Sequence, residues 1–120
     1  MKNIDINITL IANNEKQEYS VIGEYDDINN ILSYQEKSPE LITVTLNLKE
    51  NKFIRDNKDY RLECHFELNN ITNNILLLKD LNKNLENPIK TTILENKTGI
   101  FEVSYLIIDS NELVSYKIKY

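Results

Sequence analysis

The sequence predicts an all-β protein, folded as an antiparallel up-and-down barrel of about eight strands. Apolar side chains recur at every second position in three stretches, 4–10, 60–68 and 101–107, which is the period of a strand with one buried face. Short strands with turns every 8–12 residues or so are typical of sandwiches and antiparallel barrels. No pattern of parallel crossover helices is present. Hairpin connections throughout favour the closed barrel, because closure removes exposed edges.

The first strands follow from alternation, and their ends follow from turn residues. Segment 3–11 places its apolar residues at even positions, and segment 17–25 continues on one face with odd positions. Gly23 falls in the middle of the second segment, which predicts a bulge or a tight bend of the kind that barrels need at corners. Segment 31–36 is a short strand, and we expect residues 37–39 to end it.

The middle of the chain has the clearest alternation. Segment 41–48 points its even-numbered apolar residues inward and its Thr and Asn residues outward. A short strand is expected at 52–55 and a long one at 59–68, followed by a turn over 69–74. The next strand begins at Ile75, where four consecutive apolar residues break the alternation. Leu76 is therefore expected either to be buried on a two-sided strand or to face a partner.

Residues 81–88 are predicted to form a loop or an irregular strand. Apolar residues four apart also fit a helical turn there, whereas Pro88 argues against a central strand. Gly99 is expected at positive φ in a hairpin loop. The remaining strands are predicted from the same alternation at 89–95, 100–108 and 112–120.

The turns of this chain must be built largely without glycine. Only Gly23 and Gly99 are present, whereas asparagine occurs 18 times. Asparagine tolerates left-handed backbone better than other residues that have a side chain. We therefore expect asparagine to supply the positive φ angles of the turns.

Composition bounds the class of protein. A chain of 120 residues with a formal net charge of −5 makes one soluble domain that disfavours nucleic acid. Its one Cys excludes an intramolecular disulfide, and no apolar run reaches the length of a signal peptide or a membrane span. We therefore expect a cytoplasmic protein that binds neither nucleic acid nor membrane.

Residues that usually do chemistry are scarce. Cys64 and His65 are the one pairing of a nucleophile with a base, but neighbours on a strand face opposite sides, so Cys64 is predicted to be a core residue beside a surface His65. The pairs Asp26-Asp27 and Asp56/Asp59 lack the spacing of a calcium loop and are expected to serve turns and solubility. The sequence therefore predicts no catalytic residues, no metal site and no cofactor.

The candidate ligand-binding residues are one arginine and three of the seven tyrosines. Tyr34, Tyr60 and Tyr105 fall on predicted strands, where they either cap the core or line a lumen suited to a small amphipathic ligand. Arg55 either bonds the carbonyls of its own turn, which we favour, or contacts an anionic ligand.

The order of these features resembles the YwiB-like family, small bacterial proteins of unknown function with a calycin-like β-barrel. The resemblance rests on the strand 4–10 with the Glu-rich turn after it, on 30–36, on 42–48 with 53–57 and 64–66, and on 88–93 with 101–105. It covers the whole chain and implies a fold, not a reaction. Where the family has Gly in two turns, this chain has Asn57 and Asn82, which can preserve a left-handed backbone.

These observations lead to two hypotheses for function. The first is a non-catalytic binding protein that holds a small amphipathic ligand in the barrel. The second is a protein–protein interaction or structural module with a filled barrel. A lumen cavity favours the first, and a filled interior with an exposed apolar patch or an open edge favours the second. The sequence does not fix the oligomeric state.

Overall fold

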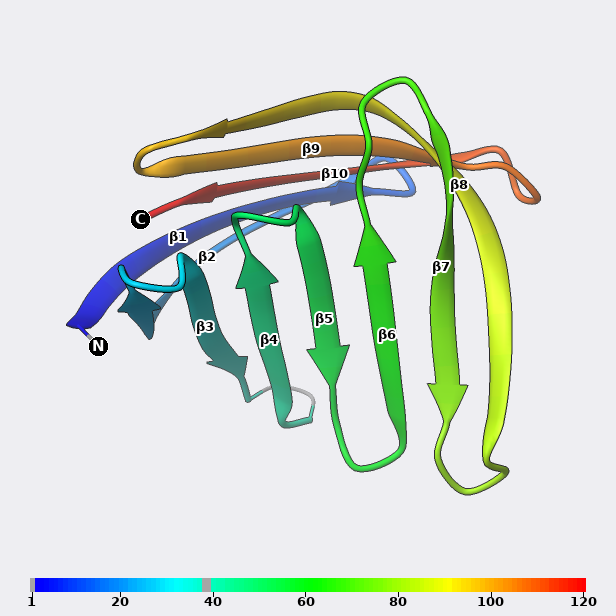
Figure 1. The fold of residues 1–120 in the computed structure, drawn as a ribbon, viewed down its shortest axis with the longest axis horizontal. Helices are drawn as coiled ribbons and strands as arrows, with labels where there is room; N and C mark the ends of the chain where they lie inside the picture. The colour runs from blue at the N-terminus through cyan, green and yellow to red at the C-terminus, as the bar shows by residue number, and fades with distance from the viewer. Residues whose placement is uncertain (1, 38–39) are drawn as a thin grey trace.

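The structure, a computed structural model, describes residues 2–37 and 40–120. Within this range the chain forms ten strands and no helix (Figure 1). The strands are β1 (Lys2–Ala12), β2 (Glu15–Asp26), β3 (Ile31–Glu36), β4 (Ile42–Asn47), β5 (Lys52–Asp56), β6 (Tyr60–His65), β7 (Ile71–Leu78), β8 (Lys83–Lys97), β9 (Ile100–Ile107) and β10 (Glu112–Lys119). In this part of the chain, no helix is long and apolar enough to cross a membrane.

The strands form a closed antiparallel barrel, which confirms the predicted architecture. Each strand pairs with its neighbours in sequence, and β1 pairs with β10 to close the wall. There are ten strands rather than about eight, because every segment with strand character takes a place in the wall, including the short one at 52–56. Figure 1 shows β3–β7 running roughly across the direction of β1, β2, β9 and β10, so the barrel is flattened into two crossing layers.

Strand β8 joins the two layers on one side of the barrel. Its first half pairs with β7 and its second half with β9, and the register shifts between Thr91 and Ile93, where an irregularity lets the strand bend (Figure 1). Residues 83–88, expected as a loop or an irregular strand, belong to β8. Pro88 is tolerated because its carbonyl accepts the Ile108 amide from the β9 side, so its nitrogen also points to that side, beyond the end of the β8–β9 ladder.

Gly23 makes the opposite corner. A Cβ at this position would lie 2.4 Å from Ile6 Cδ1 and 2.5 Å from the carbonyl oxygen of Ser33. The missing side chain therefore lets the β3 backbone pass directly over β2. The pairing of β2 with β1 runs through Gly23 without a register shift, so the expected bulge is absent there. The strands β2 and β3 then separate, and only three residue pairs join them, from Glu24–Ser33 to Asp26–Ile31.

Asparagine supplies the left-handed turns, as predicted. Every described residue other than glycine with positive φ is an asparagine: Asn13, Asn14, Asn30, Asn51, Asn69, Asn82 and Asn111. Gly99 has a φ of 85° in the β8–β9 turn, also as expected. The consecutive positive φ angles of Asn13 and Asn14 form the two-residue hairpin turn that matches the twist of the flanking strands.

The turns predicted after residues 36 and 68 differ from the other turns in how far the structure bears on them. The turn expected over 69–74 is shorter, because Asn69 alone takes the left-handed conformation and β7 begins at Ile71. Asn74 is consequently buried inside that strand. The strand end expected at 37–39 lies partly outside the described residues.

The core follows the alternation read from the sequence. The inward faces of the strands contribute a single cluster of buried apolar residues. Leu76 is outside this cluster: it is half-buried and lies opposite Leu62 on β6 and Leu85 on β8, of which Leu85 is exposed. Aromatic rings pack in the centre, with Phe66 5.4 Å from Tyr105 and Phe53 5.1 Å from Tyr116 between ring centroids. The middle of the barrel is therefore filled by side chains.

The hairpin between β1 and β2 tests the use of asparagine. We expect Asn14→Gly to leave the free energy of unfolding nearly unchanged and Asn14→Ala to lower it by about 1 kcal/mol, because alanine is strained at positive φ. Urea unfolding measures both. Asn73→Ala, an exposed asparagine in β7 without positive φ, is the matched control. Equal losses for Asn14→Ala and Asn73→Ala contradict the prediction.

Candidate functional site

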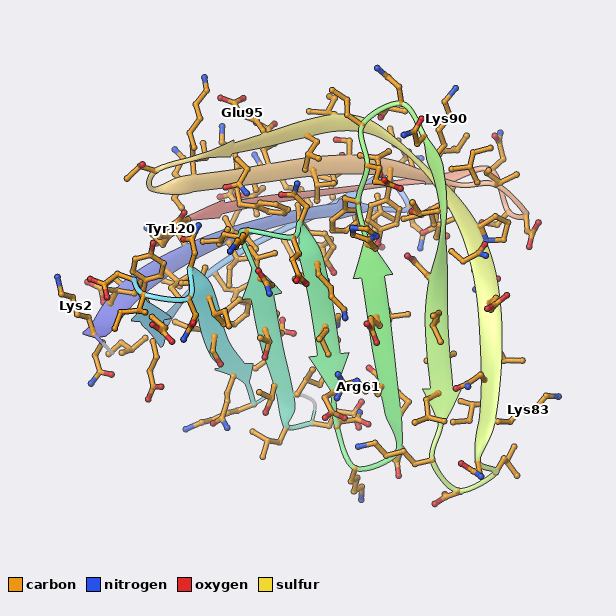
Figure 2. All side chains as sticks on the ribbon, viewed as in Figure 1. Lys2, Arg61, Lys83, Lys90, Glu95 and Tyr120 are labelled. Atoms are coloured by element: carbon orange, nitrogen blue, oxygen red, sulfur yellow. The ribbon has the colours of Figure 1, made fainter. Side chains whose placement is uncertain are left out.

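Arg55 points into the barrel rather than toward its own turn. It follows Phe53 by two positions on β5 and lies opposite Val44 of β4, and both of these neighbours are buried on the inner face. By contrast, Figure 2 shows the lysines Lys2, Lys83 and Lys90 on the outside of the barrel, where they are exposed. Arg55 is therefore the cation that the fold brings inward.

The partner of Arg55 is Glu36 at the end of β3. Arg55 Nη2 lies 2.8 Å from Glu36 Oε1, and the two side chains are only 17% and 15% exposed. The contact is an ion pair outside hydrogen-bonding geometry, because Oε1 is buried without a hydrogen-bond partner. The Tyr19 hydroxyl donates to Oε2 of the same carboxylate and so connects β2 to β3.

Tyrosines surround this ion pair. Burial by itself lowers the pKa of Arg55, but Tyr116, Glu36, Tyr34 and Tyr60 raise it above its ordinary value. A guanidinium held in this way stays charged at any physiological pH. The structure thus brings three of the predicted residues, Arg55, Tyr34 and Tyr60, to one place.

Tyr34 and Tyr105 are buried, and burial raises the pKa of both hydroxyls. Tyr105 packs against Phe66, with 5.4 Å between ring centroids, and does not line the groove between β2 and β3. Tyr34 is only 2% exposed, and its hydroxyl oxygen has no hydrogen-bond partner among the described residues. Such a buried hydroxyl costs free energy, so it marks a position where a polar partner would be favourable.

A groove opens beside this cluster, where β2 and β3 separate. Its volume is about 900 Å³. Tyr19, Tyr34 and Glu36 form its floor, Val21 and Gly23 lie on its β2 side, and Arg55 lies behind Glu36. The groove therefore combines two tyrosines, Val21 and Ile22 with a larger number of polar side chains, among them Gln17, Gln35 and Lys37. This lining is more polar than that of most small-molecule sites, and it suits a ligand with several polar groups.

The favoured prediction that Arg55 bonds the carbonyls of its own turn is wrong. Asn57 holds that turn instead, because its Oδ1 accepts the amides of Asp59 and Tyr60, each at 2.8 Å. Lys79 adds a contact of 2.7 Å to Asp56. Of the two asparagines that replace the family's glycines, Asn82 adopts positive φ, whereas Asn57 acts through its side chain.

Cys64 and His65 face opposite sides, as predicted. The thiol is buried in the core and His65 is exposed. Burial raises the pKa of Cys64 to about 12, so almost no thiolate forms at neutral pH. This pair therefore has neither the geometry nor the ionisation of a nucleophile and its base.

The acidic pairs serve turns. Asp26 Oδ1 accepts the amides of Ile28 and Asn29 at 3.1 and 3.2 Å, and Asp56 pairs with Lys79. Over residues 2–37 and 40–120, no group of three or more His, Cys, Asp or Glu side chains is placed to hold a metal ion.

Sequence reasoning missed Glu36, Tyr19 and Tyr116. The signal was present for Glu36, because it has the same parity on β3 as the buried Leu32 and Tyr34. Its inward position therefore follows from alternation, although a charged residue is seldom assigned to a core face.

Comparison with known proteins supports the fold. The structure is similar to the crystal structure of the ywiB protein from Bacillus subtilis, with a TM-score of 0.71 over 97% of this chain and 88% of that chain, at 15% sequence identity. The predicted resemblance to YwiB is thereby confirmed as a likeness of fold. No protein-family model matches the sequence, and no curated protein matches it.

The ion pair gives a test of the inward position of Arg55. We expect Arg55→Ala to lower the free energy of unfolding by about 3 kcal/mol, because it leaves the Glu36 carboxylate buried without a cation. The double variant Arg55→Met with Glu36→Gln removes both charges and is expected to cost much less than the two single variants together. Urea unfolding measures this difference. Lys16→Ala, from an exposed pair with Glu18, is the control and should change stability little. Additive losses contradict the pairing.

The buried thiol gives a second test. Native protein should resist alkylation of Cys64 by iodoacetamide at pH 8, because both the raised pKa and the burial suppress the thiolate. Protein unfolded in urea should react readily under the same conditions. Intact-mass spectrometry follows the reaction, and rapid labelling of the native protein would show that the barrel opens around Cys64.

Proposed function

We propose that this chain is a non-catalytic binding protein that holds a small amphipathic ligand in the groove between β2 and β3. The groove leads from the barrel surface to the floor of Tyr19, Tyr34 and Glu36, with Arg55 behind it. Its volume of about 900 Å³ lies within the range of small-molecule sites. The likeness of the barrel to calycins is part of this proposal, since small barrels of that type hold one small ligand.

The observation that carries the proposal is the Tyr34 hydroxyl. Tyr34 lines the groove, and its hydroxyl oxygen lies buried beneath the groove surface without a hydrogen-bond partner in the described chain, next to an ion pair that is largely removed from water. A ligand therefore reaches this oxygen only when the side chains that cover it move aside. Protein interiors seldom keep such a group without compensation. A ligand polar group that bonds this hydroxyl while its apolar part covers Val21 would supply that compensation.

Two observations support a non-catalytic role. Cys64 is held away from His65 at a raised pKa, and the ionisable groups at the groove are already engaged with each other as Arg55–Glu36–Tyr19. A general base needs a free carboxylate or imidazole at the substrate. We also keep the proposal of cytoplasmic residence. We keep the proposal that the chain does not bind nucleic acid, and the net charge of −5 supports it.

The alternative is an interaction or structural module. The filled centre of the barrel favours it, because no large lumen separates the core aromatic rings, such as Phe66 and Tyr105, from their neighbours. The open groove with buried polar groups at its floor favours the ligand.

Tyr34→Phe tests the proposal. The variant removes the unpaired hydroxyl, so the unliganded protein should keep its stability or gain on the order of 1 kcal/mol in unfolding free energy. The same variant should lose the small molecule that native mass spectrometry detects on freshly purified wild-type protein. Tyr120→Phe, at the far end of β10 and outside the groove, should retain it. Wild-type protein that carries no small molecule, or a Tyr34→Phe variant that retains it fully, counts against the site.

A further inference from the structure

The β2 strand presents an open edge to the groove. Within the described residues, the β2–β3 ladder covers only Glu24–Ser33 to Asp26–Ile31, whereas β2 itself extends back to Glu15. On one side, that earlier part of β2 is fully paired with β1. Its other side therefore carries backbone groups that no described residue pairs in a ladder.

The residues that present these groups follow from the ladder. The Ser33 carbonyl oxygen lies on the β2 side of β3, beside Gly23. Ser33 therefore forms a hydrogen-bonded backbone pair with its β2 partner Glu24. Residues alternate in direction along a strand. The amides and carbonyls of Ser20 and Ile22 therefore face the groove, while those of Tyr19, Val21 and Gly23 bond to β1.

The β3 side of the groove offers the same kind of group. The Leu48 amide donates to the Asn30 carbonyl at 2.9 Å, which fixes Asn30–Leu48 as a hydrogen-bonded pair. Backbone groups alternate in direction along a strand, so Leu32 and Tyr34, two and four residues after Asn30, also direct their amides and carbonyls to β4. Gln35 consequently turns its backbone toward the groove, which has a strand edge on each side.

We propose that the groove takes an extended peptide segment of another protein, which adds to the free edge of β2 as a further antiparallel or parallel strand. This inference goes beyond the proposed function, because it gives the same groove a peptide strand as its ligand in place of a small molecule. A strand is the ligand whose amides and carbonyls repeat at the spacing of Ser20 and Ile22. Main-chain hydrogen bonds to those two residues would hold the strand. Contacts with the groove floor would select its side chains.

The two faces of β2 specify an alternating peptide. On the outer face, Ile22 is 74% exposed, so an apolar residue of the added strand gains a cross-strand contact there. On the inner face, the next side chain lies over the groove lining of Tyr19 and Glu36, whose oxygens favour a small hydroxyl residue such as threonine. The preferred sequence therefore alternates apolar and small hydroxyl residues.

The shape of the groove favours one free strand over the edge of a second barrel. The groove is a wedge that closes at Gly23, with β3 on its far side. A strand that belongs to a folded sheet brings its neighbouring strand with it, and that neighbour would meet β3. The outer end of the edge is also protected against association between copies, because Lys16 and Glu18 place charges there.

The test uses wild-type protein and a capped peptide in which valine and threonine alternate between terminal lysines. Amide hydrogen exchange followed by NMR reports on individual residues. At a peptide concentration about ten times its Kd, the amides of Ser20 and Ile22 should exchange about tenfold more slowly. The amides of Tyr19 and Val21, already bonded to β1, should change little.

A twin peptide with the same side chains but N-methylated on alternate residues is the matched control. Methylation on the amides that face β2 removes the donors of the ladder, so a peptide with this pattern should give no protection. Methylation on the other set of amides leaves those donors in place. Equal protection by both peptides, or none by the unmodified peptide up to millimolar concentration, overturns the inference. Protection of Ser20 and Ile22 that grows with protein concentration alone, with a dimer by sedimentation, overturns it in favour of a second copy.

The peptide inference and the small-molecule proposal can fail independently, and two measurements distinguish the two outcomes. If the peptide gives no protection while Tyr34→Phe still loses a co-purifying small molecule, the groove is a small-molecule site and the peptide inference fails. If the peptide protects Ser20 and Ile22, Ser20→Pro should weaken its binding, because it removes a groove-facing amide without touching the β1 ladder. Ser20→Ala should not.

Discussion

The close contact between Gly23 and the Ser33 carbonyl determines how this barrel closes. A side chain on Gly23 would collide with the β3 backbone and with Ile6, so only glycine lets the two crossing layers meet at this corner. The crossing leaves only three residue pairs between β2 and β3. Closure and the groove are therefore two results of one contact. The other corner needs no such gap, because β8 is long enough to bend through a register shift and pair in both layers.

The polar groups inside the barrel are placed where the wall is incomplete. In a fully paired wall, an inward Arg55 and Glu36 would be enclosed by apolar residues, and the cost of removing both charges from water would be high. Beside the β2–β3 gap both keep slight exposure, and Glu36 also accepts a hydrogen bond from Tyr19. The ion pair thus joins β3 to β5 and, through Tyr19, to β2. It tethers the strands that the backbone ladder leaves apart, and it forms the floor of the groove at the same time.

Much of this fold is predictable from the sequence, because alternation and turn chemistry are local. The inward residues of β4 and the left-handed asparagines follow directly from spacing and residue type. Arg55 was misassigned because it precedes a turn, although its parity with Phe53 placed it inside. The number of strands and the short β2–β3 ladder depend on which strands meet in space, and no local pattern encodes that. The groove was unpredictable for the same reason, since it consists of missing pairs.

An open strand edge normally promotes aggregation, because its unpaired backbone groups can pair with another sheet. The residues along the open edge of β2 indicate what this edge is used for. Near the first turn, the edge is guarded by the exposed Lys16–Glu18 pair, which discourages association with other sheets. Near the corner the guard stops, and Ser20 is followed by an exposed Ile22. If solubility alone had shaped this edge, the charges would continue to Gly23. A change from charged residues at the open end to Ser20 and an exposed Ile22 beside the groove is better explained by selective occupation of the groove than by incomplete protection.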